Sequence, residues 1–133
     1  MVAYSFKAQF VDPIETRAKR QTVRAFRKRH AHPGEPIQLY TAMRTRHCRK
    51  ILTPDPICIR LRHVIIAQGS SQPLFIELDG VMLDRDAIEA FAIADGFGAS
   101  AQDGLAARRM AEFWLKAHGP KSFGGVVIQW EPR

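Results

Sequence analysis

Apolar and polar positions alternate over much of the first 80 residues, and this pattern predicts a series of short strands. A period of two places successive side chains on opposite faces of a sheet. The predicted extended segments are residues 3–10, 20–26, 36–41, 57–67 and 74–78. In the longest segment the pattern puts Ile57, Ile59 and Leu61 on one face and Cys58, Arg60 and Arg62 on the other. Asp79-Gly80 predicts a tight turn.

The sequence also predicts helices, one after the first predicted strand and two before the last. Asp12 as N-cap and Pro13 at the first helical position predict a short helix to about residue 18. Beyond residue 83 the apolar spacing becomes helical, with Asp84 as the cap and Asp95-Gly96 as the end. A further helix is predicted over residues 101–117, with Leu105 on its apolar face, and a last strand over 123–130. The order predicts one α+β domain over residues 1–133, with helices at the ends of a barrel-like mixed sheet.

Charge is distributed unevenly along the chain. Residues 1–62 hold 14 basic and 4 acidic side chains, a balance of +10, and residues 63–133 hold 6 and 9, a balance of −3. These values sum to the net charge of +7. Such an asymmetry indicates a polyanionic partner, with nucleic acid or a nucleotide as the first candidate.

Several classes of protein are disfavoured by composition. No apolar run reaches the roughly 20 residues of a membrane helix, and the first residues, MVAYSFK, lack the layout of a signal peptide. Cys48 and Cys58 are expected as reduced thiols, and the five histidines have no metal-ligand spacing. We expect a cytoplasmic protein with no membrane contact, no metal and no cofactor, and a monomer.

The segment AKRQTVR at 18–24 is the strongest candidate for chemistry. In an extended chain Arg20, Thr22 and Arg24 share one face, and Lys19 lies at the strand entrance. Cations around a hydroxyl suit a phosphate or a polarised carbonyl, and a lysine whose pKa is lowered can activate a threonine. A solvated edge strand has the same pattern, so both interpretations stay open here.

A second cationic group lies between two predicted strands and consists of Arg44, Arg46, Arg49 and Lys50. A planar guanidinium can donate two parallel hydrogen bonds to one phosphate, so these side chains are candidates for binding a nucleic-acid backbone. Tyr40 is a candidate for stacking on a base. The alternatives are a charged strand edge that resists aggregation and a half-buried core tyrosine.

Five segments together resemble a known family. They are KRQTVR at 19–24, PGEPIQLY at 33–40, TAMRTRHCRK at 41–50, ADGF at 94–97, and Trp114 with FGGVVIQW at 123–130. In order and spacing these segments resemble the ASCH domain. The fold of that domain is similar to the pseudouridine-synthase-and-archaeosine-transglycosylase (PUA) barrel. The segment at 41–50 resembles the corresponding segment of phage-type members. The resemblance implies a PUA-like mixed β-barrel with a short N-terminal helix and two helices before the last strand.

The resemblance also implies a site. Threonine-bearing members include the N4-acetylcytidine amidohydrolases, which use a lysine, a threonine and an acidic residue, and the matching positions are Lys19, Thr22 and Asp95. This chain has an aspartate where the characterised enzymes have a glutamate, and Ala42 where many members have glycine. The expected function is binding of RNA or a modified nucleoside in a basic cleft. An amidohydrolase on N4-acylated cytidine and a ribonuclease are the alternatives, so enzymatic activity stays open.

Overall fold

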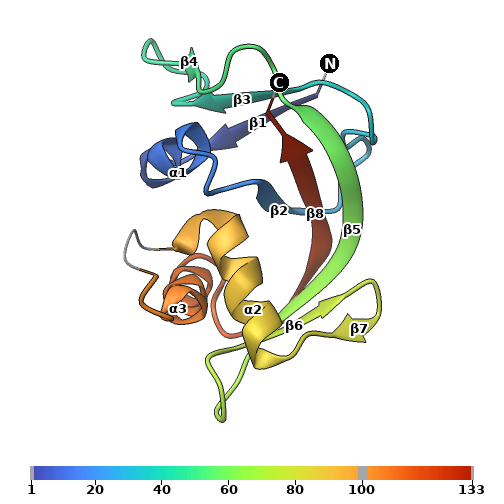
Figure 1. Cartoon of the computed structure of the whole chain (residues 1–133), viewed down its shortest axis with the longest axis vertical. Helices are drawn as coiled ribbons and strands as arrows, with labels where there is room; N and C mark the ends of the chain where they lie inside the picture. Colours follow the sequence, from blue (N-terminus) through green and yellow to red (C-terminus); the bar gives the residue numbers. More distant parts are fainter. Residues whose placement is uncertain (1, 99–101, 133) are drawn as a thin grey trace.

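Two β-sheets and three α-helices form the α+β fold of this chain (Figure 1), described by a computed structural model over residues 2–98 and 102–132. One sheet has the strand order β1-β3-β4 and the other β2-β8-β5-β6-β7. The strands are β1 (Val2–Phe6), β2 (Gln21–Ala25), β3 (Ile37–Thr41), β4 (Arg49–Lys50), β5 (Ile57–Gln68), β6 (Leu74–Leu78), β7 (Val81–Met82) and β8 (Phe123–Glu131). Within the described residues the ladders form two sheets rather than one closed barrel.

The two sheets are joined on one side and open on the other. On the joined side, Cys58 N–H donates to Glu35 O at 2.9 Å, and Pro36 and Ile57 form an isolated bridge. On the open side, β1 and β2 each form the edge of a sheet. We call the gap between these edge strands the β1–β2 seam. Arg24 crosses it, because its guanidinium Nη2 donates to Ser5 O at 2.7 Å.

The helices lie at the open side of the sheets (Figure 1). A 3-10 turn, η1 (Ala8–Phe10), leads into the short helix α1 (Val11–Glu15), and α2 (Arg85–Ala92) continues as a π-helical turn, η2 (Ile93–Phe97). Helix α3 (Ala106–His118) packs beside α2. Both helices therefore precede β8. None of the helices in the described residues combines the length and apolar character of a membrane span.

Several sequence predictions agree closely with these elements. The strand at 74–78 has the predicted bounds, and the Asp84 carboxylate accepts from Ala87 N–H at 2.8 Å, as an N-cap should. Asp79 and Gly80 both have positive φ, at 49° and 83°, which is the backbone of a tight hairpin turn. Each of these signals is local, so tertiary packing does not alter it.

Other predictions were wrong in detail. Residues 8–10 are helical rather than extended, and α1 ends at Glu15. A β-bulge between Cys58 and Arg60 interrupts the predicted alternation, so that Cys58 is buried while Ile59 and Arg60 are both exposed. Leu105 is exposed, since α3 begins only after it, and the predicted helix start at residue 101 lies outside the described residues.

A buried histidine ties β1 to the end of β2. His30 Nε2 lies 3.0 Å from Ala25 O, which can only accept, so Nε2 carries the proton and Nδ1 accepts. Tyr4 Oη lies 2.9 Å from Nδ1 and donates to it, while Ala31 N–H donates to the same oxygen at 3.3 Å. Burial lowers the pKa of His30, which keeps the ring neutral.

Replacing Tyr4 by phenylalanine should lower the free energy of unfolding by about 1–3 kcal/mol, because two buried groups then lose their partner. The wild-type chain should also lose stability as the pH falls below 6.5, the ordinary imidazole pKa. The pKa of His30 is lower in the folded chain, so the unfolded chain takes up the proton first. Urea titrations near pH 7.5 and pH 5.5 measure both effects, with the exposed His32→Asn variant as the control. Equal stability of Tyr4→Phe and wild type would show that the bond contributes nothing.

Candidate functional site

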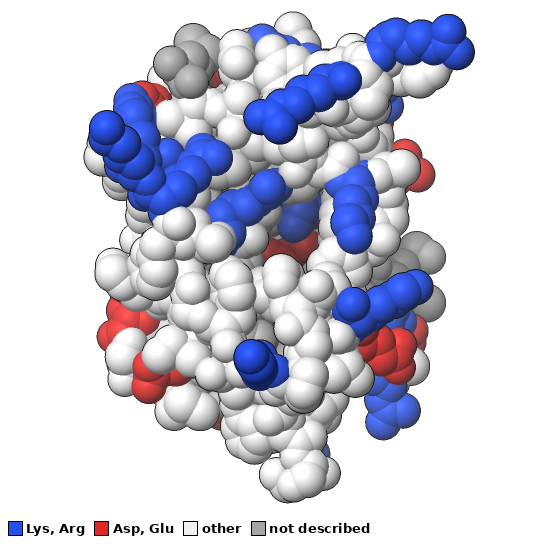
Figure 2. All heavy atoms as spheres, turned by 180° about the vertical axis from the view of Figure 1, so that it is seen from behind, with Lys and Arg blue, Asp and Glu red and all other residues white. Residues whose placement is uncertain are grey.

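A cavity of about 280 Å³ opens at the β1–β2 seam. Its walls come from both edge strands, η1, η2, α3 and the start of β8. The polar and charged lining residues are Ser5, Lys7, Lys19, Thr22, Arg24, Asp95 and His118, and the aromatic ones are Phe6, Phe10, Phe97, Phe113, Trp114 and Phe123. Figure 2 shows a hollow of this kind in the middle of one face, with basic side chains around it and an acidic one at its base. We call it the Lys19 cavity.

Lys19 and Asp95 form a buried ion pair in this cavity. Lys19 Nζ lies 3.8 Å from Asp95 Oδ1 and donates to the backbone carbonyl of Asp95 at 2.5 Å. The side chains are only 3% and 7% exposed. The ammonium also lies over the ring of Phe10, 4.8 Å from its centroid. Aromatic and anionic neighbours therefore replace part of the water that a lysine normally has.

Burial shifts the pKa values of both groups toward their neutral forms. Desolvation lowers the pKa of Lys19 to about 8, although Asp95 acts in the opposite direction. Desolvation raises the pKa of Asp95, against the smaller effects of Lys19 and Gln21. A lysine with this pKa exchanges protons near neutral pH. Perturbed groups in a cavity are a frequent property of functional sites.

Thr22 and Arg24 form a second polar contact in the same cavity. Arg24 Nε donates to Thr22 Oγ1 at 3.1 Å, so the hydroxyl proton remains available for another acceptor. The guanidinium also lies over the Phe6 ring, 4.9 Å from its centroid. The hydroxyl therefore faces a fixed cation, which would stabilise negative charge on it or beside it.

Backbone geometry brings residue 95 to residue 19, which lies 76 positions away. Arg20 N–H donates to Ala94 O at 2.9 Å, and Arg20 O accepts from Trp130 N–H at 3.0 Å. The π-helical turn then reverses at Gly96, whose φ is +102°. A Cβ on Gly96 would lie 2.8 Å from Lys19 Cδ and 3.0 Å from Phe10 Cδ1. Glycine is therefore needed both for the backbone conformation and for the space beside the lysine.

The predicted site residues fall into two groups. The Lys19 cavity contains Lys19, Thr22, Asp95 and Arg24 and does not contain Arg20, Tyr40, Arg44, Arg46, Arg49 or Lys50. Arg20 is exposed and donates to Arg17 O, Arg49 pairs with Glu15 at 3.6 Å, and Lys50 pairs with Asp55 at 2.9 Å. Arg44 and Arg46 are exposed and Tyr40 is half-buried. This second cationic group belongs to β4 and the segment that joins it to β3, in the half of the molecule where basic side chains gather in Figure 2.

Sequence reasoning missed the aromatic wall and one polar contact. Trp114 stacks on His118 with centroids 4.3 Å apart and contacts Phe123 at 4.7 Å. Apolar periodicity marks such rings as buried but does not show that a cavity lies beside them. Gln21 is not among the predicted site residues, yet its amide donates to Asp95 Oδ1 at 3.4 Å. Lys19, two residues earlier, reaches the same carboxylate, and β2 begins only at Gln21.

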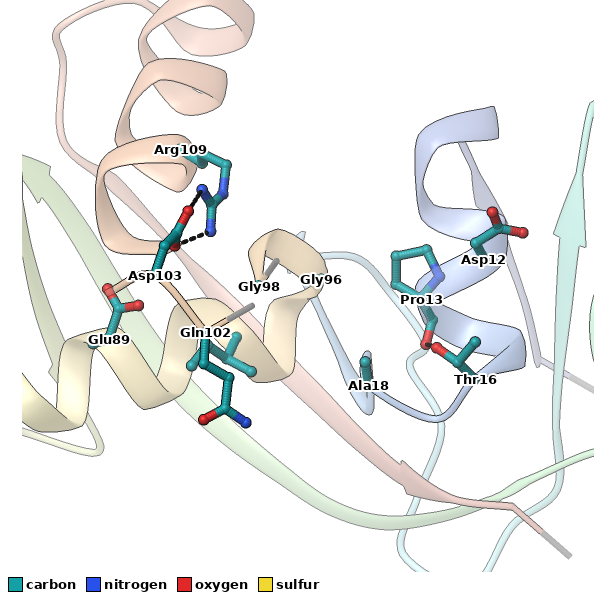
Figure 3. Close-up of a pocket in the computed structure, with 11 residues that line it drawn as sticks. Asp12, Pro13, Thr16, Ala18, Glu89, Gly96, Gly98, Gln102, Asp103 and Arg109 are labelled. Carbon is teal, nitrogen blue, oxygen red and sulfur yellow. Dashed lines mark hydrogen bonds and ion pairs between the residues drawn. The ribbon is translucent and has the colours of Figure 1, made fainter. Parts of the chain in front are cut away.

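A second cavity, of about 320 Å³, lies between α1 and the α2–η2 segment (Figure 3). Three of its charged side chains form hydrogen bonds or ion pairs with other parts of the chain. Arg109 forms two bonds of 2.9 Å with Asp103 and one of 2.7 Å with Phe97 O. Glu89 accepts from the first N–H groups of α3 at 3.0 and 2.9 Å, which caps that helix. These contacts commit Arg109, Asp103 and Glu89 to the fold, and the remaining charged residue of the lining, Asp12, is exposed on α1.

Comparison with protein-family models, with curated proteins and with solved structures finds no match to this chain.

Gly96→Ala should lower the free energy of unfolding by more than backbone strain alone would, because the new Cβ also meets Lys19 and Phe10. Gly34 is the matched control, because its φ is +90° and a Cβ there meets nothing within 4 Å. Gly34→Ala should cost about 1–3 kcal/mol of stability from strain. Gly96→Ala should cost clearly more, since Lys19 and Phe10 must also move. Urea unfolding of the two variants measures the difference, and equal costs would show that the contact with Lys19 is easily relieved.

Proposed function

We propose that this chain is an ASCH-like, PUA-like domain that binds the base of a nucleoside, free or within RNA, in the Lys19 cavity. The observation that carries the proposal is a buried, oppositely charged pair at one end of an aromatic-lined cavity. Small-molecule sites are mostly apolar, with a few polar groups that fix orientation. A volume of about 280 Å³ suits a single small ligand.

The lining has the two properties that a base requires. Flat heterocycles stack on aromatic rings, and the Trp114–His118–Phe123 group offers such rings beside the cavity. Lys19 is a donor, and Asp95 is an acceptor when ionised. Cytosine presents acceptors next to the N4 amino donor, and carboxylates characteristically accept from that amino group. A cytosine edge therefore complements Lys19 and Asp95 better than a uracil edge, which has an oxygen at position 4.

The charge of the surrounding surface suits a ligand that carries phosphate. Lys7 and Arg24 line the cavity, and the second cationic group lies on β4 and on the segment that joins it to β3. Phosphate neutralisation supplies much of the affinity of proteins for nucleic acids and depends strongly on salt. The second cationic group, including Arg44 and Arg46, would hold the backbone outside the cavity.

A second candidate function, hydrolysis of an N4-acylated cytidine, is favoured by the lowered pKa of Lys19. The neutral amine would take the proton of the Thr22 hydroxyl, whose oxygen attacks the acyl carbon. Arg24 would stabilise the resulting oxyanion. The C–N bond then breaks, and the leaving amine receives its proton from the Lys19 ammonium. Water hydrolyses the acyl-threonine to release the acid, with Lys19 again as the base.

Base discrimination tests the binding proposal. Wild-type protein should bind cytidine about 10-fold or more tightly than uridine, since hydrogen bonds to a charged group contribute about 1.5–3 kcal/mol. Asp95→Asn should reduce this preference, because an amide can also donate to the uracil oxygen. Titration calorimetry with both nucleosides measures the ratio, and Lys121→Met serves as an exposed-lysine control. A ratio unchanged in Asp95→Asn would show that Asp95 does not contact the base.

The hydrolase candidate predicts a pH profile. Release of acetate from N4-acetylcytidine should increase as the pH rises and level off above about 8, the pKa of Lys19, because only the neutral amine accepts a proton. Lys19→Ala should abolish the release, and Thr22→Ser should keep part of the rate while Thr22→Val keeps none. Circular dichroism of each variant controls for folding. If wild-type protein binds cytidine but releases no acetate, the cavity binds without catalysis.

A further inference from the structure

An exposed aromatic ring lies just outside the Lys19 cavity. Phe26 directly follows β2, two residues beyond Arg24, and is 61% exposed. Its ring reaches His63 of β5, with centroids 5.8 Å apart. Strand β8 lies between β2 and β5 and carries Gly124 and Gly125 at this level, opposite Ile65 and Val64.

The segment that carries Phe26 is basic, whereas His63 has a carboxylate beside it, because its backbone N–H donates to Asp79 Oδ1 at 2.8 Å. Residues 24–29 read RAFRKR, with four cations and no acid. Arg27 and Lys28 are exposed, and neither forms an ion pair within residues 2–98 and 102–132. The guanidinium of Arg27 lies over the Tyr4 ring, 4.7 Å from its centroid, which holds it beside β1. The patch therefore combines two aromatic rings with two cations, Arg27 and Lys28, that form no ion pair with a carboxylate of the described chain.

We propose that Phe26 and His63 form a stacking platform for a base of single-stranded RNA, with Arg27 and Lys28 on the flanking phosphates. Stacking on exposed aromatics beside cations is how proteins bind single strands without reading sequence. Charge complementarity selects this partner over an apolar protein surface, since exposed cations disfavour burial against uncharged groups.

This inference rests on the proposed base site, because it makes the ligand of the Lys19 cavity one residue of a strand. Arg24 and Ala25 line the cavity, and Phe26 follows them along the same backbone. A base in the cavity and its neighbour on the platform would lie on either side of Arg24. The platform thus predicts that an oligonucleotide binds more tightly than the free nucleoside.

The test uses a fluorescein-labelled ten-residue cytidylate RNA, followed by anisotropy, and free cytidine, followed by calorimetry. Phe26→Ala should weaken binding of the RNA by about 10-fold, the size of one lost base stack, and Phe26→Tyr should retain it. Binding of cytidine should be unchanged in both. Met82→Ala is the matched control, because Met82 is 56% exposed on the edge strand β7. Arg27→Gln with Lys28→Gln should reduce the slope of log affinity against log salt by about 1.4, or about 0.7 for each phosphate contact.

The outcomes separate the two proposals. Failure of wild-type protein to bind any nucleoside would contradict the base site, while the RNA comparison would still test the platform. Equal RNA affinity of Phe26→Ala, Met82→Ala and wild type would overturn the platform. A dimer of the wild-type chain that Phe26→Ala converts to monomers, measured by sedimentation, would also overturn it, because the patch would then be a self-contact.

Discussion

The buried pair of Lys19 and Asp95 is the constraint around which the site is organised. Moving two ions out of water costs several kcal/mol each, and only their attraction and nearby hydrogen bonds offset this cost. Each charge is therefore stabilised largely by the other. The pair consequently holds the entrance of β2 against the π-helical turn after α2. Removing one partner should lower the free energy of unfolding, whereas a neutral replacement of both is compatible with the fold.

Arg24 has a similar role across the β1–β2 seam. Edge strands present unpaired backbone groups, and proteins cover or charge such edges to prevent association. Here one guanidinium bonds Ser5 O and Thr22 Oγ1 and lies over the Phe6 and Tyr4 rings. The seam is thus bridged by a side chain rather than closed by a ladder, and the cavity exists because no strand fills that space.

Local patterns predicted much of the fold and only part of the candidate site. The Asp84 cap and the 74–78 strand depend on residues close in sequence, so they could be foreseen. The bulge at Cys58 could not, because it depends on how β5 pairs with β8. Lys19, Thr22 and Asp95 were grouped by a family resemblance, and they do line one cavity. The wall of Trp114, His118 and Phe123 was not foreseen, because it requires knowledge of how α3 and β8 meet.

The strand order has a consequence for how the chain acquires its structure. Among the residues that the structure describes, strand β2 pairs with β8 alone, so Gln21 meets Gln129 across more than 100 intervening residues. Pairings between segments so distant in sequence require large loops to close and are slow to form. Until residues 123–131 are in place, β2 lacks a partner and its cationic segment stays open to other contacts. The basic character of residues 17–29 would then hinder aggregation of the unpaired strand during folding.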